Sequence, residues 1–253
     1  MLQSWVKELD SRILGSALAS ARRAYRMNRS GVRVGLNGTL SWQVDMKARN
    51  QVAELCDMHG SDKGSRMASG HSYQWPPHRY CEFYARMFDH CRFSIGRVFE
   101  CGIGSSNAAI SSSMGPNARA GASLRVWRDY FPNAQIYGAD IDQTVLFQED
   151  RIKTYFVDQM SIDLIEKMWL DIGVADFDLI IDDGLHTVAA AETLFNNSFS
   201  KLRQGGVYVV EDMLWEYAVS LCDRLRHLGC SPEIVSSTML SGHPDSFLVI
   251  IRR

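Results

Sequence analysis

Short apolar runs alternate with amphipathic stretches along the chain from residue 97 onward. The runs predict strands at 98–101, 135–139, 153–157, 177–181 and 206–210. The stretches between them predict helices at 121–130, 162–170, 189–202 and 213–228. The last two strand runs are almost continuously apolar, which is typical of parallel strands that are covered on both faces.

Two further strands are predicted at 233–237 and 247–252, and the short connection between them favours an antiparallel pair. The whole pattern predicts an α/β fold. We expect a doubly wound, Rossmann-like, mostly parallel seven-stranded sheet with an antiparallel C-terminal hairpin, spanning residues 97–253.

Residues 1–96 are expected to form a separate N-terminal helical and lid segment. Helical spacing is visible over 2–27, 46–58 and 81–89, and glycines between β-branched residues suggest a hairpin over 31–41. A polar loop rich in aromatic residues lies before the last of these helices, where Pro76 and Pro77 prevent a helix. Aromatic residues in such a loop either cap a binding site or pack on the core.

Composition narrows the class of protein. The chain has 253 residues and a net charge of -2, so a general nucleic-acid binder is not expected. No run approaches the roughly 18 apolar residues of a membrane span, and charges interrupt the first ten residues where a signal peptide needs an apolar core. The six cysteines form no Cys-x-x-Cys pair, and we interpret them as reduced thiols of a cytoplasmic protein.

A glycine turn follows the first strand of the sheet. Gly102 and Gly104 permit a sharp turn and close approach of a ligand, and Asp140 at the end of the second strand could accept hydrogen bonds from ribose hydroxyls. The 36 residues from Gly104 to Asp140 exceed the roughly 20 of a dinucleotide fold. The 16 small and polar residues at 105–120 account for the difference. The sequence therefore predicts a loop inserted between the turn and its helix.

That insertion bears on the cofactor. It would disturb the contact of a pyrophosphate with the helix N-terminus, whereas a phosphate-free cofactor such as S-adenosylmethionine would tolerate it. Glu100 suits a ligand that carries an amino group, and Asp158 could accept a hydrogen bond from an adenine amino group. Gln159 and Asp182 are further candidates for cofactor binding. The alternative is a purely structural turn beside a buried acid, with Asp158 near the start of the next helix.

Acidic residues end two strands that are expected to be neighbours. Asp182 and Asp183 follow the fourth strand, and Glu211 and Asp212 follow the fifth. Carboxylates gathered in this way repel one another, and their oxygens suit Mg²⁺, with Mn²⁺ or Ca²⁺ as options. His186 could accept a proton from a substrate hydroxyl. The alternative makes these residues turn residues, helix caps and a packed histidine.

Together, the segments 100–104, 121–142, 181–186 and 205–212 resemble class I S-adenosylmethionine-dependent methyltransferases. The resemblance is greatest to the metal-dependent sugar O-methyltransferases of macrolide tailoring, which have relatives in polysaccharide gene clusters. Residues 61–64 and the aromatic run after them also fit this group. The resemblance covers roughly residues 55–215, and the chain departs from it at the insertion.

The resemblance implies a division of roles. Asp183, Glu211 and Asp212 would hold the metal, with His186 as general base. The cofactor would contact Glu100, Gly102, Gly104, Asp140 and Asp158. The acceptor would be a sugar hydroxyl of a glycoside, nucleotide sugar or saccharide, and an extra N-terminal segment would favour a homo-oligomer. Two alternatives stay open: metal-independent methyl transfer to nitrogen or carbon, and a cofactor-binding module without catalysis. A nicotinamide-dependent oxidoreductase is disfavoured by the disrupted turn.

Overall fold

The computed structural model describes residues 39–40, 50–66, 73, 75–237 and 242–253. The chain divides into two compact units, Met1–Val44 and Asp45–Arg253. The described part of the first unit is the short strand β1 (Thr39–Leu40). The predicted helix over 2–27 and most of the predicted hairpin over 31–41 lie outside the described residues. The second unit holds every predicted site residue.

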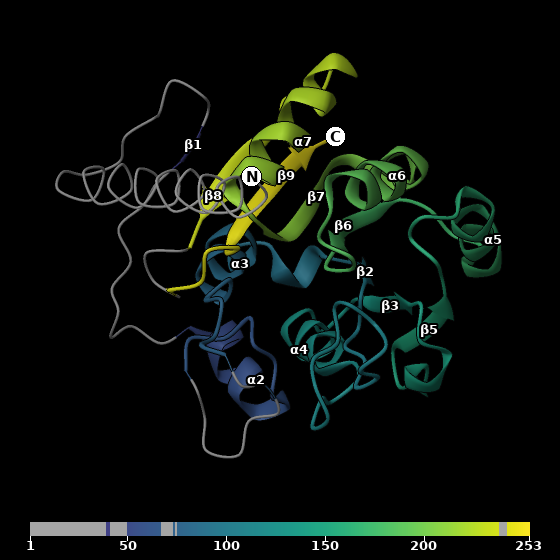
Figure 1. The fold of residues 1–253 in the computed structure, drawn as a ribbon. Coiled ribbons are helices and arrows are strands. Elements are labelled where there is room, and N and C mark those ends of the chain that lie inside the picture. The colour runs from purple at the N-terminus through teal and green to yellow at the C-terminus, as the bar shows by residue number, and fades with distance from the viewer. Residues whose placement is uncertain (1–38, 41–49, 67–72, 74, 238–241) are drawn as a thin grey trace, which may run out of the picture. The chain divides into compact units, whose positions relative to one another are not determined.

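The second unit is built on a sheet of eight strands in the order β8-β9-β7-β6-β2-β3-β5-β4 (Figure 1). Strands β5, β3, β2, β6 and β7 run parallel, and β9 is antiparallel to both β7 and β8. The predicted architecture is confirmed, with the two-residue β4 as an addition. The strands are β2 (Arg97–Cys101), β3 (Gln135–Asp140), β4 (Gln148–Glu149), β5 (Ile152–Phe156), β6 (Phe177–Asp182), β7 (Leu202–Met213), β8 (Glu233–Ser236) and β9 (Phe247–Arg252).

Helices cover both faces of the sheet. On one face α5 packs against α6 and α6 against α7, while on the other α2 packs against α3 and α4 (Figure 1). Helices α2 and α3 belong to the same compact unit as the sheet. The predicted start of the cofactor-binding domain at residue 97 stays a prediction. The helices are α2 (Gln51–His59), α3 (Cys81–Phe88), α4 (Ala122–Tyr130), α5 (Ile162–Ile172), α6 (Val188–Ser198) and α7 (Trp215–His227).

The predicted boundaries on both sides of β7 are wrong, because this strand spans Leu202–Met213 and takes in the end of one predicted helix and the start of the next. The helix expected over 189–202 ends at Ser198, and a 3-10 turn over Phe199–Lys201 leads into β7, which begins at Leu202. Leu202 is fully buried opposite Phe177 of β6, so its apolar side chain belongs to the sheet. Helical spacing continues across this residue in the sequence, which is why the pattern assigned it to the helix.

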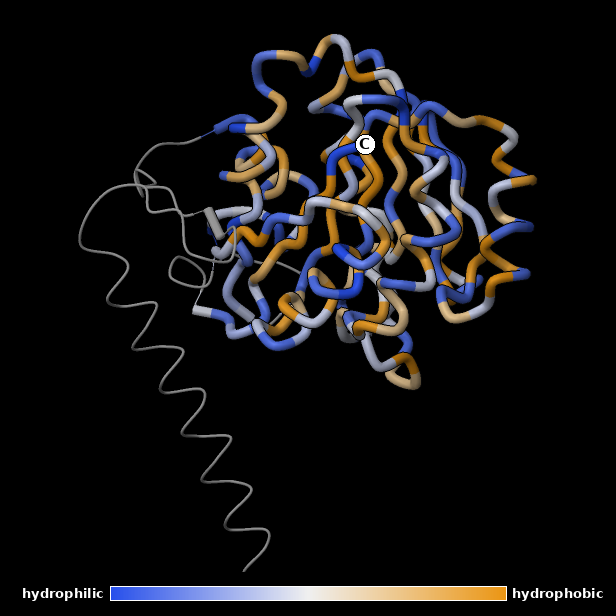
Figure 2. The backbone as a smooth tube through the Cα atoms, turned by 90° about the horizontal axis from the view of Figure 1, so that it is seen from above, coloured by the Kyte–Doolittle hydropathy of each residue, from blue (hydrophilic) through white to orange (hydrophobic). Residues whose placement is uncertain are grey.

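Alternation along β2 separates the core from the site. Phe99 is fully buried against Trp169 of α5, with ring centroids 4.7 Å apart, on the face that α5, α6 and α7 cover. Its neighbour Glu100 points to the opposite face, where its carboxylate meets Trp127 of α4. Hydrophobic stretches gather in the central strands in Figure 2. An acid in this strand is therefore buried beside the apolar layer.

The topology creates a crevice at the carboxyl end of β2. The chain winds outward through β3 and β5, then returns to add β6 and β7 on the other side, so β2 lies at the switch point. Cys101 is in register with both Ala139 and Asp182, and Asp182 with Val210. The glycine turn and the predicted acids come just after these positions. The strand register therefore places them side by side at the same edge of the sheet.

The sequence predicts reduced cysteines and no membrane-spanning segment. All six cysteines lie in the described part and are free thiols, four of them buried. Among the described residues, no helix combines the length and apolarity that crossing a bilayer requires.

Asp178 is a buried acid that the sequence pattern did not single out. Its Oδ2 accepts hydrogen bonds from the backbone amides of Gly96 and Arg97 at 2.7 and 2.9 Å, and its Oδ1 accepts one from Nε of Arg203 at 2.5 Å. These contacts join β6 to the start of β2 and to β7. They lie at the end of the sheet opposite to the crevice.

Replacing Asp178 with Ala should lower the free energy of unfolding by about 2–4 kcal/mol, because two backbone amides lose a charged acceptor. Asp171→Ala is the matched control, since Asp171 is half exposed and, among the described residues, forms an ion pair with Lys167 of the same helix alone. We expect that change to cost less than about 1 kcal/mol. Urea unfolding followed by circular dichroism measures both, and equal effects would contradict the assignment.

Candidate functional site

A cavity of about 310 Å³ lies at the carboxyl ends of the strands, near the lower end of the roughly 300–1,000 Å³ typical of small-molecule pockets. Predicted residues of both sites line it together, namely Gly102, Gly104, Asp140, Asp183, His186 and Asp212. The remaining predicted residues do not line it, namely Glu100, Asp158, Gln159, Asp182 and Glu211. The structure thus joins the two predicted sites into one.

Gly102 is required by the approach of two strands. Its φ is 87°, and a Cβ there would lie 2.0 Å from the backbone oxygen of Asp183. The amide of Asp183 in turn donates to the carbonyl of Cys101 at 2.8 Å. Gly104 also has a positive φ, but its nearest neighbour would be Met114 at 3.5 Å. The first glycine therefore sets the position of Asp183, in addition to any contact with a ligand.

Asp140 braces the same turn. Its two carboxylate oxygens accept hydrogen bonds from the amides of Ile103 and Asp142, each at 2.9 Å. Burial nevertheless raises the pKa of Asp140, against the effect of these bonds. The side chain still lines the cavity and can accept further hydrogen bonds there. The predicted contact with ribose hydroxyls stays a prediction that this position supports.

The insertion predicted at 105–120 precedes the helix as expected. The Met114 amide donates to the Ser105 carbonyl at 2.8 Å, and the Ser105 hydroxyl donates to Asp142 at 2.5 Å. Helix α4 begins at Ala122, after Gly121 with a φ of 68°. Several residues of the insertion line the cavity, namely Ser105, Ile110, Ser112, Ser113, Met114 and Arg119. The insertion is therefore one wall of the site.

Lys63 is the main residue that the sequence pattern did not reveal. Its ammonium lies 2.6 Å from Asp183 and 3.3 Å from Glu100, and it also contacts Glu211. The side chain is only 3% exposed, and although burial opposes the charge, the surrounding acids raise the pKa of Lys63. The chain itself thus supplies a cation to the acids. A lysine in a polar loop carries no sequence signal of such burial.

The acids beneath the cavity have partners within the fold. Glu211 is fully buried and accepts hydrogen bonds from Lys63 and from the hydroxyl of Tyr84. Glu100 is also fully buried and accepts a hydrogen bond from Nε1 of Trp127 at 2.6 Å. Burial raises the pKa of Glu100 to about 6, although Lys63 opposes the shift. Neither carboxylate faces the cavity, so the roles predicted for them stay predictions.

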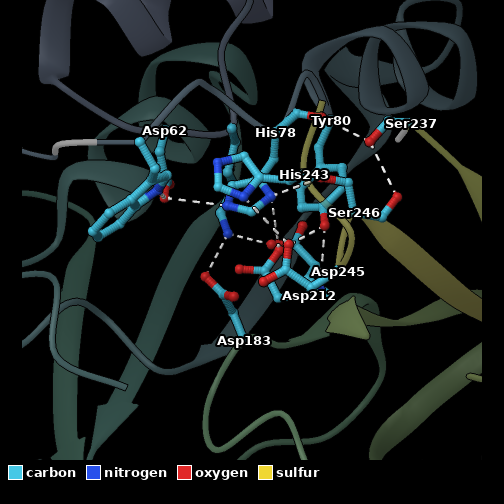
Figure 3. Close-up of polar contacts among 12 residues, drawn as sticks. Asp62, His78, Tyr80, Asp183, Asp212, Ser237, His243, Asp245 and Ser246 are labelled. Atoms are coloured by element: carbon cyan, nitrogen blue, oxygen red, sulfur yellow. Dashed lines mark hydrogen bonds and ion pairs between the residues drawn. The ribbon is translucent and has the colours of Figure 1, made fainter. Parts of the chain in front are cut away.

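Asp183, His186 and Asp212 converge at the cavity. One ligand atom from each residue lies within 4.8 Å of the others, an arrangement that could hold a metal ion. Asp212 accepts a hydrogen bond from the Tyr80 hydroxyl at 2.6 Å and lies 3.4 Å from Nδ1 of His78 (Figure 3). The buried Nε2 of His186 lies 3.4 Å from Asp183 and has no hydrogen-bond partner among the described residues.

Within the group Asp183, His186 and Asp212, two residues have a strained backbone and two have strongly shifted pKa values. His186 and Asp212 have φ values of 57° and 53°, in the left-handed region that costs roughly 1–3 kcal/mol at non-glycine residues and is frequent at functional sites. Burial works against protonation of His186, but Asp183 and Asp212 outweigh it and raise its pKa to about 9. For Asp183 burial opposes ionisation, yet Lys63 and His186 hold its pKa at about 2.

Asp182 and Gln159 support the turn that carries Asp183. Nε2 of Gln159 donates to Asp182 at 2.6 Å, and its Oε1 accepts from the Leu185 amide at 3.0 Å. A Cβ at Gly184 would lie 2.2 Å from that same oxygen. Asp158 accepts a hydrogen bond from the Met160 amide at 2.9 Å and is half-buried outside the cavity lining. The predicted cofactor contacts of these three residues remain predictions.

The wall beyond Asp212 comes from two segments: the aromatic-rich loop, which was expected to cap a site or pack on the core, and the connection between β8 and β9, which had no predicted role. His78 stacks on His243 of the connection between β8 and β9, with ring centroids 4.8 Å apart, and Asp245 lies nearby (Figure 3). Nε1 of Trp75 donates to Asp62 at 2.9 Å. No spacing in the sequence relates residues 62–78 to 243–245, because only the fold brings them together.

The fold is that of the class I S-adenosylmethionine-dependent methyltransferases. The solved structure of MycE methyltransferase from the mycinamycin biosynthetic pathway, in complex with Mg and SAH, matches with a TM-score of 0.58 and 24% identity. The match covers 81% of this chain and 55% of that one. A second crystal form of MycE matches with a TM-score of 0.55 and 26% identity. No protein-family profile matches the chain.

Sequence similarity confirms the resemblance to sugar O-methyltransferases. The 8-demethyl-8-alpha-L-rhamnosyl tetracenomycin-C 2'-O-methyltransferase of Streptomyces olivaceus is 33% identical over 66% of this chain and 38% of its own length. The mycinamicin VI 2''-O-methyltransferase of Micromonospora griseorubida is 36% identical over 55% of this chain and 33% of its own length. The chain thus matches little more than a third of these curated relatives.

Gly102→Ala should displace the end of β6, because the added methyl group overlaps the backbone of Asp183. We expect a loss of about 3 kcal/mol or more in the free energy of unfolding, a large effect for one substitution. Gly104→Ala shares the positive φ but meets only ordinary contacts, so its loss should be about 1–2 kcal/mol. Equal losses in chemical denaturation would contradict the close approach of the two strands.

Lys63→Met should lower the free energy of unfolding by about 3–5 kcal/mol, because it leaves buried carboxylates without their cation. Lys167→Met is the matched control, since Lys167 is 65% exposed and pairs with Asp171 at the surface. That change should cost less than about 1 kcal/mol. Guanidinium unfolding distinguishes the two, and a Lys63 variant as stable as the control would contradict the buried ion cluster.

Proposed function

We propose that the protein is an S-adenosylmethionine-dependent, Mg²⁺-assisted O-methyltransferase that methylates a hydroxyl of a sugar, in a glycoside or another saccharide-bearing small molecule. One observation carries the proposal. A single cavity is lined both by the glycine turn with Asp140 and by the group Asp183, His186 and Asp212. The relatives support the same reaction, since their names specify O-methylation of a rhamnosyl tetracenomycin and of mycinamicin VI.

The residues present fit a divalent cation. Asp183 and Asp212 offer carboxylate oxygens at the cavity, and Nε2 of His186 lies beside them, 3.4 Å from Asp183. The geometry supports these two acids more directly than Glu211, whose carboxylate is held by Lys63 and Tyr84. When bound, the cation supplies Lewis acidity that eases deprotonation of an acceptor hydroxyl, and the cofactor supplies the methyl group.

The chain's own residues orient the reactants and move the proton. His186 takes the hydroxyl proton at Nε2, and for this it has to be neutral. The charges of Asp183 and Asp212 raise its pKa, so their use as metal ligands removes the interaction that keeps it protonated. Asp140 accepts hydrogen bonds from the cofactor's ribose, and the insertion covers that half of the cavity.

Four expectations belong to the same proposal. We propose a role in natural-product or polysaccharide biosynthesis, a cytoplasmic location, a homo-oligomeric assembly and no nucleic-acid partner. The net charge of -2 supports the last of these, because binding to nucleic acid generally requires a basic surface.

His186→Ala should lower the turnover number by about 10²–10⁴-fold, because a positioned base is lost, while the affinity for S-adenosylhomocysteine changes by less than about 2-fold. His227→Ala, at the exposed end of α7, is the control and should leave both unchanged. Transfer of a labelled methyl group to a panel of neutral glycosides and calorimetric titration of the cofactor product measure the two quantities. Full turnover in the His186 variant would reject the base.

Chelation separates the proposal from its alternatives. Methyl transfer should stop when EDTA removes divalent cations and return when Mg²⁺ is added in excess. Transfer that is unaffected by EDTA would favour the metal-independent N- or C-methyltransferase. Tight cofactor binding with no transfer across a broad acceptor panel would favour a binding module.

A further inference from the structure

The charges that line the cavity are unevenly distributed. Among the described residues, one lysine and one arginine line it, Lys63 and Arg119. Five aspartates line it as well, namely Asp62, Asp140, Asp183, Asp212 and Asp245. Lys63 forms ion pairs with Asp183, Glu100 and Glu211 and is almost fully buried. Arg119 is exposed, and none of the ion pairs among the described residues includes it. Among the described residues that line the cavity, it is therefore the one guanidinium available to a ligand.

The fold fixes the backbone of Arg119 beside Gly104 of the glycine turn. Its carbonyl oxygen would lie 4.0 Å from a Cβ at Gly104 and accepts a hydrogen bond from the Ala122 amide at 3.1 Å. Two residues later, the Gly121 amide donates to the Ile103 carbonyl at 2.7 Å. Both ends of this short segment are thus tied to the turn and to α4.

These bonds also change what α4 can bind. The amides at the start of a helix hold the phosphate of a dinucleotide in the ordinary arrangement. Here the amides of Gly121 and Ala122 are used by Ile103 and Arg119. An anionic group of the ligand therefore loses these two donors and needs another one. The guanidinium of Arg119 offers paired donors that match a carboxylate.

We propose that Arg119 binds the carboxylate at the amino-acid end of S-adenosylmethionine, so that the insertion at 105–120 takes over anion binding from the N-terminus of α4. The inference rests on the proposed function, since it requires this cofactor. The cofactor has one carboxylate and one ammonium at that end and no phosphate. The aspartates of the cavity repel the first and attract the second, so the position of Arg119 orients the amino-acid end.

The test compares two ligands that differ in one group. S-adenosylhomocysteine carries the carboxylate, and its decarboxylated analogue keeps the amino group and the nucleoside. Calorimetric titration of each ligand into the full chain gives the dissociation constants. Arg119→Met should weaken S-adenosylhomocysteine by about 10-fold or more and the decarboxylated analogue by less than about 2-fold. Arg119→Lys should give an intermediate loss, because it keeps the charge without the paired donors.

Arg226→Met serves as the matched control, since Arg226 lies on α7 outside the cavity lining and should change neither constant. Unchanged binding of S-adenosylhomocysteine to Arg119→Met would overturn the inference. An equal loss for both ligands would also overturn it, because it would show that Arg119 only shapes the loop. If neither ligand bound the wild-type chain, the proposed function itself would fail, together with the inference built on it.

Discussion

The buried ammonium of Lys63 is the interaction on which the site depends. It lies among the carboxylates of Glu100 in β2, Asp183 just after β6 and Glu211 in β7, strands whose ends meet at the crevice. Carboxylates taken out of water carry a large desolvation cost and repel one another, so an arrangement of three of them needs a partner charge. Lys63 supplies it from a loop that lies before the sheet in the sequence. The loop is thereby joined to the strand ends that hold the site.

The same cluster divides the acids by what they can do. Glu100 contacts Lys63 and Trp127, and Glu211 contacts Lys63 and Tyr84. Neither carboxylate lines the cavity. Asp183 belongs to both groups, since one oxygen contacts Lys63 and the other lies near His186. Gly102 matters here because its lack of a Cβ lets the chain of Asp183 come this close. Glu100 and Glu211 thus support the site from below, whereas Asp183 and Asp212 line the cavity itself.

Much of the fold could be predicted from the sequence, because hydrophobic periodicity reports local structure and burial. The strands of the sheet apart from β4 followed from the apolar runs along the chain, and the insertion followed from the spacing of Gly104 and Asp140. The predicted end of the helix before β7 was wrong, since Leu202 fits both a helical spacing and a strand. Local pattern cannot decide which partner a side chain finds across the sheet. At the site, six of the predicted residues line one cavity, because parallel strands bring their ends together, and the roles predicted for them stay predictions. Their partners were not predictable, as Lys63 and the His78–His243 stack show, because these depend on loops distant in the sequence.

In the proposed enzyme, one cavity joins a phosphate-free nucleoside cofactor to a divalent cation. Thermal-shift measurements with S-adenosylhomocysteine and with NAD, each with and without Mg²⁺, test it most directly. A ligand that binds only the folded chain raises its stability, by about 2.7 kcal/mol at a hundred times its dissociation constant. We predict stabilisation by S-adenosylhomocysteine, a further increase with Mg²⁺, and no effect of NAD. Stabilisation by NAD alone would contradict the claim.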